Sequence, residues 1–445
     1  MKKIQKALAK KPHISNRDMQ FWFCAISLSG FAITVVVLFI SHGDLFPKIF
    51  YKDIYDTGMD FFHSIEYVRG RSPYELFHTL YPPLANLFFY LLYRFVPLSQ
   101  SSQWADTFSG GIEARRTSID LRVWQPTLML FIGFIALTAI ALVFLVPNIL
   151  GRSAKSEMVG LCMVLSYGVI KTYERGNIVI IAVLCCMFFV AYKDSANPYL
   201  KELALIALAI GFGLKIYPAV FGILLIYEKE YFKAARTVLY GLIAFIAPLF
   251  VFHGGISNLS FVINKLLAYG GPSTSSSSGY SFDKILTSIV LMLQSIWHFE
   301  IAEVPWITFT TWANKILFIA LLLRGFFLRK KWQKVLICTL SLLVYQNQAM
   351  YVVTFMLIPL VFMLKEEKTI CKSNFIPFIG LVFMCILLPI YDMNNAIISF
   401  ISLRMQICML ALIIWVFMTK ETTSGKLTHF FQMKNVKTTK VGGEH

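Results

Sequence analysis

The feature that most constrains this chain is a run of uncharged, mostly apolar residues from Phe21 to Ile40. A helix rises about 1.5 Å per residue, so about twenty residues match the hydrocarbon core of a bilayer, which is about 30 Å thick. The run is longer than the apolar part of a secretory signal, and Ser41 to Gly43 make a poor cleavage site. We therefore expect a helix that crosses a membrane and stays in the protein.

Many similar segments follow. Of the 445 residues, 57% are hydrophobic and only 15% are charged, whereas about a quarter of the residues of a soluble domain are charged. The sequence predicts an all-α integral membrane protein, a polytopic bundle of about 11–14 transmembrane or re-entrant helices. The apolar segments lie at 20–41, 80–99, 123–146, 157–172, 177–192, 202–214, 217–227, 237–252, 285–298, 307–328, 335–348, 350–364, 374–391 and 396–418.

Two of the apolar stretches are interrupted by polar residues. Lys215 to Pro218 breaks one of them, and Tyr345 to Gln348 breaks another. Backbone groups that a broken helix frees at membrane depth need protein or water around them. The breaks therefore predict a cavity.

Positive charge predicts the orientation. The formal net charge is +17, and the first 17 residues and the tail after residue 419 are both rich in basic side chains. Because cytoplasmic segments carry an excess of Lys and Arg, we expect a cytoplasmic N-terminus (1–19), one membrane domain (20–418) and a cytoplasmic tail (419–445). No basic and aromatic surface module is visible, so nucleic acid is not an expected partner, and the bilayer is.

The same rule places the loops. Residues 42–79 and 253–283 are predicted outside, and 228–236, 329–334 and 365–372 inside. Membrane spans can be counted forward from the N-terminus or back from the C-terminus. The two counts place the loops between 100 and 176 on different sides of the membrane. One of the segments 80–99, 123–146 and 157–172 should therefore not span, and the pattern leaves open which one. Segment 285–298 should not span either.

Cysteine placement argues against a disulfide framework or a zinc site. Seven of the eight cysteines lie in apolar runs, and Cys371 lies in a short basic loop.

Three carboxylates stand close together in the first outer loop, namely Asp53, Asp56 and Asp60. Their spacing would place them on one face of a continuous helix, although Gly58 interrupts it. Thr57 and Asp60 also have the spacing of a capping box. Helix capping, a solvated charge and catalysis all remain open from the spacing alone.

Several other charged side chains have two interpretations each. Lys215, between two apolar segments, either extends to the interface or binds a phosphate. Arg404, inside the last apolar run, is ambiguous in the same way. Glu174 and Arg175 fit an ion pair at a helix end. His63, His78 and His253 lack the spacing of metal ligands, so a metal site is the minority interpretation.

Four motifs follow one another along the chain, namely MDFFHSIEYVRGRSPYE, YPPLANLFFYLL, ERGNIVIIAVLCC and ALAIGFGLKIYPAVFGILL. In this order they resemble glycosyltransferase family 87, polytopic enzymes of the GT-C class. The resemblance covers roughly residues 50–230, and the remainder only in hydropathy. It implies a GT-C-like bundle with extracytoplasmic loops around the active site, in the cell membrane. It also implies a transferase that moves a sugar, often mannose, from a polyprenyl-phosphate donor to a lipid-linked or cell-envelope glycan acceptor.

The resemblance also implies roles for residues. The family's Asp-Phe pair maps onto Asp60 and Phe61, so Asp60 is the expected base, with Asp56 the next candidate. Where the family has Gly-Gln-Val/Ile-Asn, this chain has Arg175-Gly176-Asn177-Ile178. The residues expected to bind substrate are Lys215, Arg175, Asn177, Tyr81, His63 and Tyr217.

The expected chemistry needs no cofactor. Transfer with inversion needs a base for the acceptor hydroxyl, and the leaving polyprenyl phosphate needs positive charge more than a proton donor. Lys215 can supply that charge, so a divalent metal is not required, although Asp53 and Asp56 leave one possible.

Two other functions would share several of these features. A polysaccharide polymerase or ligase of the envelope would use lipid-linked oligosaccharides, and a lipid or solute transporter would place its charges near the midplane and show related halves. Here the charges concentrate toward one outer face, which favours the transferase.

Overall fold

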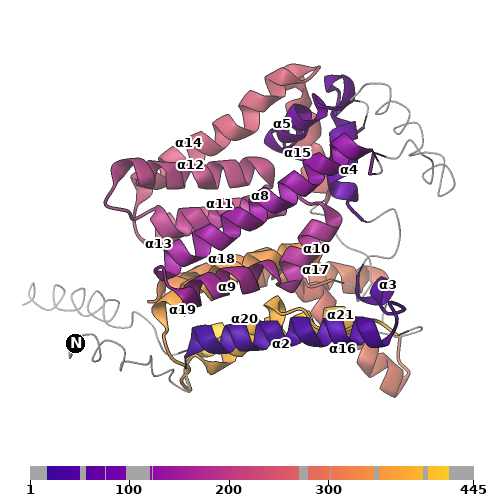
Figure 1. Cartoon of the computed structure of the whole chain (residues 1–445), viewed down its shortest axis with the longest axis vertical. Helices are drawn as coiled ribbons and strands as arrows, with labels where there is room; N and C mark the ends of the chain where they lie inside the picture. Colours follow the sequence, from indigo (N-terminus) through magenta and orange to yellow (C-terminus); the bar gives the residue numbers. More distant parts are fainter. Residues whose placement is uncertain are drawn as a thin grey trace, which may run out of the picture.

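The protein is entirely helical in the part that the structure describes. This computed structural model describes residues 18–50, 57–75, 77–96, 121–122, 124–269, 279–300, 302–344, 350–393 and 399–419. Within these ranges the elements are α-helices and short 3-10 helices, and the one β-type contact is an isolated bridge between Asp18 and Thr369. The predicted all-α membrane fold is confirmed (Figure 1).

Five helical segments in the described ranges are long and apolar enough to cross a bilayer alone. They are α2 (Met19–Ile40), α8 (Gln125–Leu150), Tyr231–Val251, α17 (Glu303–Gly325) and α21 (Phe400–Met418). The third combines α14 (Tyr231–Ile246) and η3 (Ala247–Val251). Their outer faces expose large apolar side chains such as Phe39, Ile132 and Phe232. Such faces are costly in water and suit lipid.

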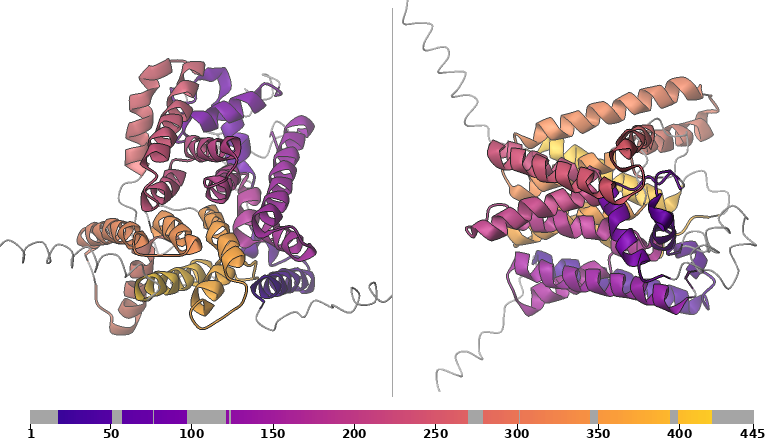
Figure 2. Two further views of the ribbon diagram at one scale, coloured as in Figure 1. Left: turned by 90° about the vertical axis from the view of Figure 1, so that its left-hand side faces the viewer. Right: turned by 90° about the horizontal axis from the view of Figure 1, so that it is seen from above.

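The other apolar segments form shorter helices joined by breaks. In chain order these are α3 (Phe46–Ile49), α4 (Met59–Tyr67), η1 (Arg69–Arg71), α5 (Pro83–Tyr93), α9 (Ala154–Val164), α10 (Tyr167–Arg175), α11 (Val179–Tyr192), α12 (Pro198–Leu214), η2 (Tyr217–Gly222), α13 (Ile223–Tyr227), η4 (Gly255–Ser257), α15 (Asn258–Tyr269), α16 (Phe282–Trp297), α18 (Lys331–Val344), η5 (Met350–Met356), α19 (Leu357–Glu366) and α20 (Phe375–Cys385). Most of the long helices run side by side, as Figure 2 shows from two directions.

The core of the bundle lies around α18 and α19. Almost every side chain of these two helices is buried, as expected for helices that are apolar all round and have neighbours on every side. The lipid-facing helices therefore surround an inner layer that carries few charges.

One end of the bundle is rich in basic residues, and we call it the basic end. There Lys155 pairs with Asp18, and the buried Lys193 pairs with Glu228 and Asp194. Arg324 donates to the carbonyl oxygens of Val416 at 3.0 Å and Thr419 at 2.7 Å. These contacts join the ends of α2, α9, α11, α13, α17 and α21.

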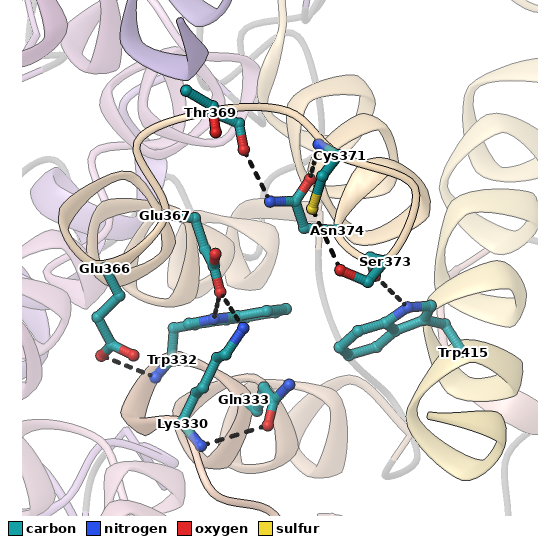
Figure 3. Close-up of polar contacts among 10 residues, drawn as sticks. All are labelled: Lys330, Trp332, Gln333, Glu366, Glu367, Thr369, Cys371, Ser373, Asn374 and Trp415. Carbon is teal, nitrogen blue, oxygen red and sulfur yellow. Dashed lines mark hydrogen bonds and ion pairs between the residues drawn. The ribbon is translucent and has the colours of Figure 1, made fainter. Parts of the chain in front are cut away.

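The turn between α19 and α20 meets the start of α2 at the basic end, where Asp18 bridges to Thr369, and Figure 3 shows its polar contacts. Glu367 accepts hydrogen bonds from Lys330 Nζ at 2.6 Å and from Trp332 Nε1 at 3.1 Å. Trp332 stacks on Trp415, whose Nε1 donates to the carbonyl of Ser373. Indole and ammonium groups thus fix this turn to α18 and α21.

The opposite end, which we call the site end, carries α4, the junction of α10 and α11, and the end of α12. It is held by contacts between distant loops, such as the His253 N–H that donates to the carbonyl of Arg71 at 2.8 Å. The 228–236 and 365–372 segments thus have residues at the basic end, and Lys215 lies at the site end, as the charge distribution predicts. Which end faces the cytoplasm stays a prediction.

The helix of segment 80–99, α5, has 11 residues and is about 16 Å long, about half of the hydrocarbon thickness. It is therefore too short to cross the bilayer alone. By contrast, α9 and α10 together lead from Lys155 at the basic end to Arg175, which pairs with Asp60 at the site end.

The helix of segment 285–298, α16, has 16 residues and is not among the candidate spans of the described chain. Which segments do not span the membrane stays a prediction. The break at Tyr345 to Gln348 and both termini lie outside the described residues.

Candidate active site

Asp60 lies in the first turn of α4 and binds side chains from a distant part of the chain. Gly58 precedes the helix with a φ of 71° and no side chain caps it, so the capping-box interpretation of Thr57 is not what the structure shows. The Gly58 N–H donates instead to the carbonyl of Glu174 at 2.6 Å. This bond places the start of α4 against the end of α10.

The turn between α10 and α11 supplies the two partners of Asp60. Arg175 Nε donates to Asp60 Oδ1 at 3.0 Å, and Asn177 Nδ2 donates to Oδ2 at 2.6 Å. Gly176, between them, ends α10 with a φ of 72°, and a Cβ there would lie 2.7 Å from Cβ of Phe61. Only glycine combines this left-handed conformation with such a close approach.

Asn177 is fully buried, and hydrogen bonds at both its amide oxygen and its amide nitrogen fix its orientation. Its Oδ1 accepts from the N–H of Val179 at 2.9 Å, so its Nδ2 faces Asp60 and lies 3.3 Å from the hydroxyl of Tyr81. Tyr81 is followed by Pro82, which caps α5, and by Pro83, its first residue. A proline at the first helical position suits the start of a helix. Asn177 thus joins Asp60 to Tyr81.

Lys215 completes the constellation at the break that ends α12. The residue is extended (φ −147°, ψ 131°), and its Nζ lies 4.1 Å from the ring centroid of Tyr81 and 5.8 Å from that of Tyr351. Among the described residues its contacts are with rings, and none accepts a hydrogen bond from it. Its N–H groups can therefore bind an anion.

Burial shifts the titration of both charged groups. It raises the pKa of Asp60, against the opposing effects of the Asn177 hydrogen bond and the Lys215 charge. It lowers the pKa of Lys215 to about 8, against the opposing charge of Asp60. The Asp60 side chain still keeps 17% exposure, so a substrate hydroxyl can reach a carboxylate of increased basicity.

The remaining predicted residues lie nearby, lie elsewhere or are not described. His63 is one turn after Asp60 on α4, with its ring 5.8 Å from that of Tyr67. Tyr217 begins η2 and packs its ring against Phe355. Asp53 and Asp56 lie outside the described residues. Arg404 is apart from the site, against the ring of Tyr167 at the other end of α10.

The pairing of Glu174 differs from the helix-end pair that its position suggests. Its carboxylate accepts from Lys171 Nζ at 2.9 Å, while Arg175 pairs with Asp60. Lys171 also donates to the carbonyl of Ile49 at 2.9 Å, which ties α3 to α10.

Sequence reasoning missed Tyr351 and Lys171. The break at Tyr345 to Gln348 was the available signal for Tyr351, because a residue that follows a break can face the cavity. For metal binding, no group of three His, Cys, Asp or Glu side chains comes together within the described ranges. The described charged groups of the site are a carboxylate and two cations, Asp60 with Arg175 and Lys215.

A carboxylate of raised pKa, a guanidinium that holds it and an ammonium with open donors suit proton removal next to a developing anion. Such a constellation could serve any transfer in which an anionic group leaves. The comparison with known families narrows this choice.

The model of glycosyltransferase family 87 matches residues 79–345. The match includes Tyr81, Arg175, Asn177 and Lys215, whereas Asp60 precedes it, so the assignment of Asp60 rests on its contacts with matched residues. No match was found among curated proteins. The match extends further toward the C-terminus than the four motifs do, covers more than half of the chain and confirms the predicted resemblance. This membrane protein is a glycosyltransferase and belongs to glycosyltransferase family 87.

Proposed function

We propose that this glycosyltransferase moves a hexose, with mannose the expected sugar, from a polyprenyl-phosphate donor to a lipid-linked or cell-envelope glycan. The reaction takes place at the extracytoplasmic face of the cell membrane and inverts the anomeric carbon. The observation that supports it is the meeting of Asp60, Arg175, Asn177 and Lys215 at one end of a membrane bundle.

In the proposed mechanism Asp60 removes the proton from the acceptor hydroxyl. The acceptor oxygen forms a bond with the anomeric carbon as the bond from that carbon to the phosphate oxygen breaks. The electron pair of the broken bond leaves with the polyprenyl phosphate, and the proton stays on Asp60 until solvent takes it. A carboxylate has about four acceptor positions, and the two bonds from Arg175 and Asn177 leave room for the hydroxyl.

The second part of the proposal is that Lys215 binds the phosphate of the donor. Its ammonium lies close enough to Asp60 for the two charges to interact, so a phosphate bound to it would place the sugar between phosphate and base. The Tyr81 ring holds this ammonium in position. A donor anchored in the bilayer suits a cation at a helix break next to lipid-facing helices, because the phosphate then reaches the site without leaving the membrane.

The first prediction concerns the reaction itself. Purified protein should transfer label from a radiolabelled polyprenyl-phosphate hexose to a component of a membrane lipid extract, and Asp60→Asn should lower the rate at least about a hundredfold because the base is lost. Asp194→Asn, at the basic end, is the matched control and should transfer at the wild-type rate.

Two results would contradict the proposal. Transfer from nucleotide sugars but from none of the polyprenyl-phosphate hexoses would remove the lipid-linked donor. Near-normal transfer by Asp60→Asn would move the base to another carboxylate. The anomeric configuration of the product, read by NMR, tests the inversion separately.

A further inference from the structure

A second feature suited to a ligand lies away from the proposed active site, between α20 and α21. It is an open groove of about 530 Å³, lined mainly by apolar side chains such as Phe383, Ile390, Met393, Phe400 and Ile407. Four of these five are exposed, with Ile407 at 59% and Met393 at 65%. Phe400 and Ile407 are on α21, a candidate span, so an apolar groove at this helix suits a lipid chain.

Arg404 gives this apolar groove a positive charge. Its Nη1 donates to the carbonyl of Ile386 at 3.2 Å, and its Cζ lies 4.9 Å from the ring centroid of Tyr167. Its Nε is buried and has no hydrogen-bond partner among the described residues. A guanidinium has five N–H donors, and the described residues leave much of this one without an acceptor.

Arg324 provides the comparison within the same chain. It also lies in a candidate span, but its Nε and Nη2 both donate to carbonyl oxygens at the end of α21. Arg324 thus has more carbonyl partners than Arg404. Because a cation without partners is costly in an apolar setting, this contrast indicates that Arg404 has a role besides joining two helices.

Lys48, a second cation near the groove, and the position of Arg404 along α21 both indicate an anionic ligand. Lys48 Nζ lies 5.7 Å from the ring centroid of Tyr391, which lines the groove. The nearby Asp392 is already bound by the hydroxyl of Ser399 and the N–H of Ile401. Arg404 is four residues into α21, about 6 Å along its axis, so its long side chain can extend from there toward lipid phosphates.

The groove is separate from the donor site. Arg404 contacts the first residue of α10, Tyr167, whereas Asp60 binds the last, Arg175. These two residues are about 12 Å apart along the helix. A phosphate at Arg404 would therefore lie apart from the site of Asp60 and Lys215.

We propose that the groove between α20 and α21 binds an anionic phospholipid, with one acyl chain along the apolar side chains and its phosphate on Arg404. The bound lipid joins α21 to the end of α20 and to the start of α10. This inference does not depend on the reaction proposed above.

The test is a titration of the full-length protein in neutral detergent, followed by native mass spectrometry. Phosphatidylglycerol should bind at least about tenfold more tightly than phosphatidylcholine with the same acyl chains. Arg404→Gln should weaken phosphatidylglycerol binding by about ten- to a hundredfold, because a charge-assisted hydrogen bond is lost. Arg324→Gln is the matched control and should keep the preference for phosphatidylglycerol.

A second pair of variants tests the groove without changing charge, also in case Arg404→Gln does not fold. Ile407→Trp fills the groove and should weaken the binding of both lipids. Ile414→Trp places the same bulk on an exposed position of α21 outside the groove and should not.

Two outcomes would overturn the proposal. One is phosphatidylglycerol binding that is as tight as in the wild type in Ile407→Trp and, where it folds, in Arg404→Gln. The other is displacement of phosphatidylglycerol by an equimolar polyisoprenyl monophosphate, which would assign the groove to the sugar donor instead.

Discussion

Lys215 carries an ammonium group that faces two aromatic rings and has no hydrogen-bond acceptor among the described residues. An ammonium that merely extended to the interface would have water or lipid phosphate around it, and arginine would serve as well. One that binds the donor phosphate acts as a compact charge in a confined place, where arginine fits less well.

The second prediction follows from this difference. Lys215→Ala should weaken use of the polyprenyl-phosphate sugar by about ten- to a hundredfold, the value of a charge-assisted hydrogen bond, while expression and acceptor binding are retained. The measurement is the donor dependence of transfer in wild type and variant. An unchanged donor response would leave only the interfacial role for Lys215.

The third prediction concerns pH. Because the pKa of Lys215 is lowered to about 8, its charge is present below that pH and is lost as the pH rises through it. Transfer should therefore decline on the alkaline side with a midpoint near 8. In Lys215→Arg the charge persists, so this decline should move to higher pH even though the rate is lower.

The acidic side of the same profile reports on Asp60. Its pKa is raised by burial, so the base is lost by protonation as the pH falls, at a pH above that for an ordinary aspartate. Lys215→Arg should leave this acidic decline in place. If the alkaline midpoint were the same in Lys215→Arg, another group would be responsible for it.

At the level of elements, the turn between α10 and α11 brings the charged groups together. The fourth prediction is that Gly176→Ala lowers both stability and transfer. A left-handed conformation costs a residue with a Cβ about 1–2 kcal/mol, and the overlap with Phe61 pushes α4 away from α10. Separation of Asp60 from Arg175 and Asn177 should lower transfer more than the loss of folded protein accounts for.

Gly222→Ala is the matched control, because Gly222 has a helical φ of −60° and no atom within 4 Å of an added Cβ. It should leave both thermal stability and transfer close to wild type. Equal losses in the two variants would mean that the close approach at Gly176 has no special role.

The sequence predicted elements better than it predicted contacts. The break at Lys215 was visible because a charge and Pro218 interrupt an apolar run, and the structure places it as expected. The short helix in segment 80–99 was not predicted. The predicted segment continues to residue 99 while α5 ends at Tyr93, and hydropathy does not distinguish a short helix followed by a turn from a longer helix.

The site shows the same limit. The charged groups Asp60, Arg175 and Lys215 were each identified, but spacing could not show that Asp60 binds Arg175, which lies 115 residues away in the chain. Tyr351 was missed because a tyrosine among apolar residues has no signal of its own. Only the packing of η5 beside α10 and η2 places its ring near Lys215.

At the level of the whole molecule, the two ends of the bundle differ in accessible thiols. Cys371 is exposed at the basic end, and the other cysteines are buried or half-buried. A hydrogen bond with Ser373 lowers the pKa of Cys371, which increases its thiolate fraction and hence its reactivity.

The fifth prediction uses this thiol to test orientation. An impermeant maleimide should not label the wild type in intact cells, and should label it after permeabilisation. In a Cys371→Ser background, His253→Cys, exposed at the site end, should be labelled from outside. The reverse pattern would place the site end, and with it the proposed reaction, in the cytoplasm.

The contacts of α2 bear on the order in which the chain is assembled. The N–H of Met19 donates to the carbonyl of Lys368, and Gly30 lies so close to Leu387 that an added Cβ would be 2.5 Å from its carbonyl oxygen. A ribosome makes α2 first and these partners near the end of synthesis. The contacts of α2 with α9, among them the pair of Asp18 with Lys155, can form earlier. The docking of α2 onto the α19–α20 turn and the chain after α20 then closes the bundle as one of the last steps of biogenesis.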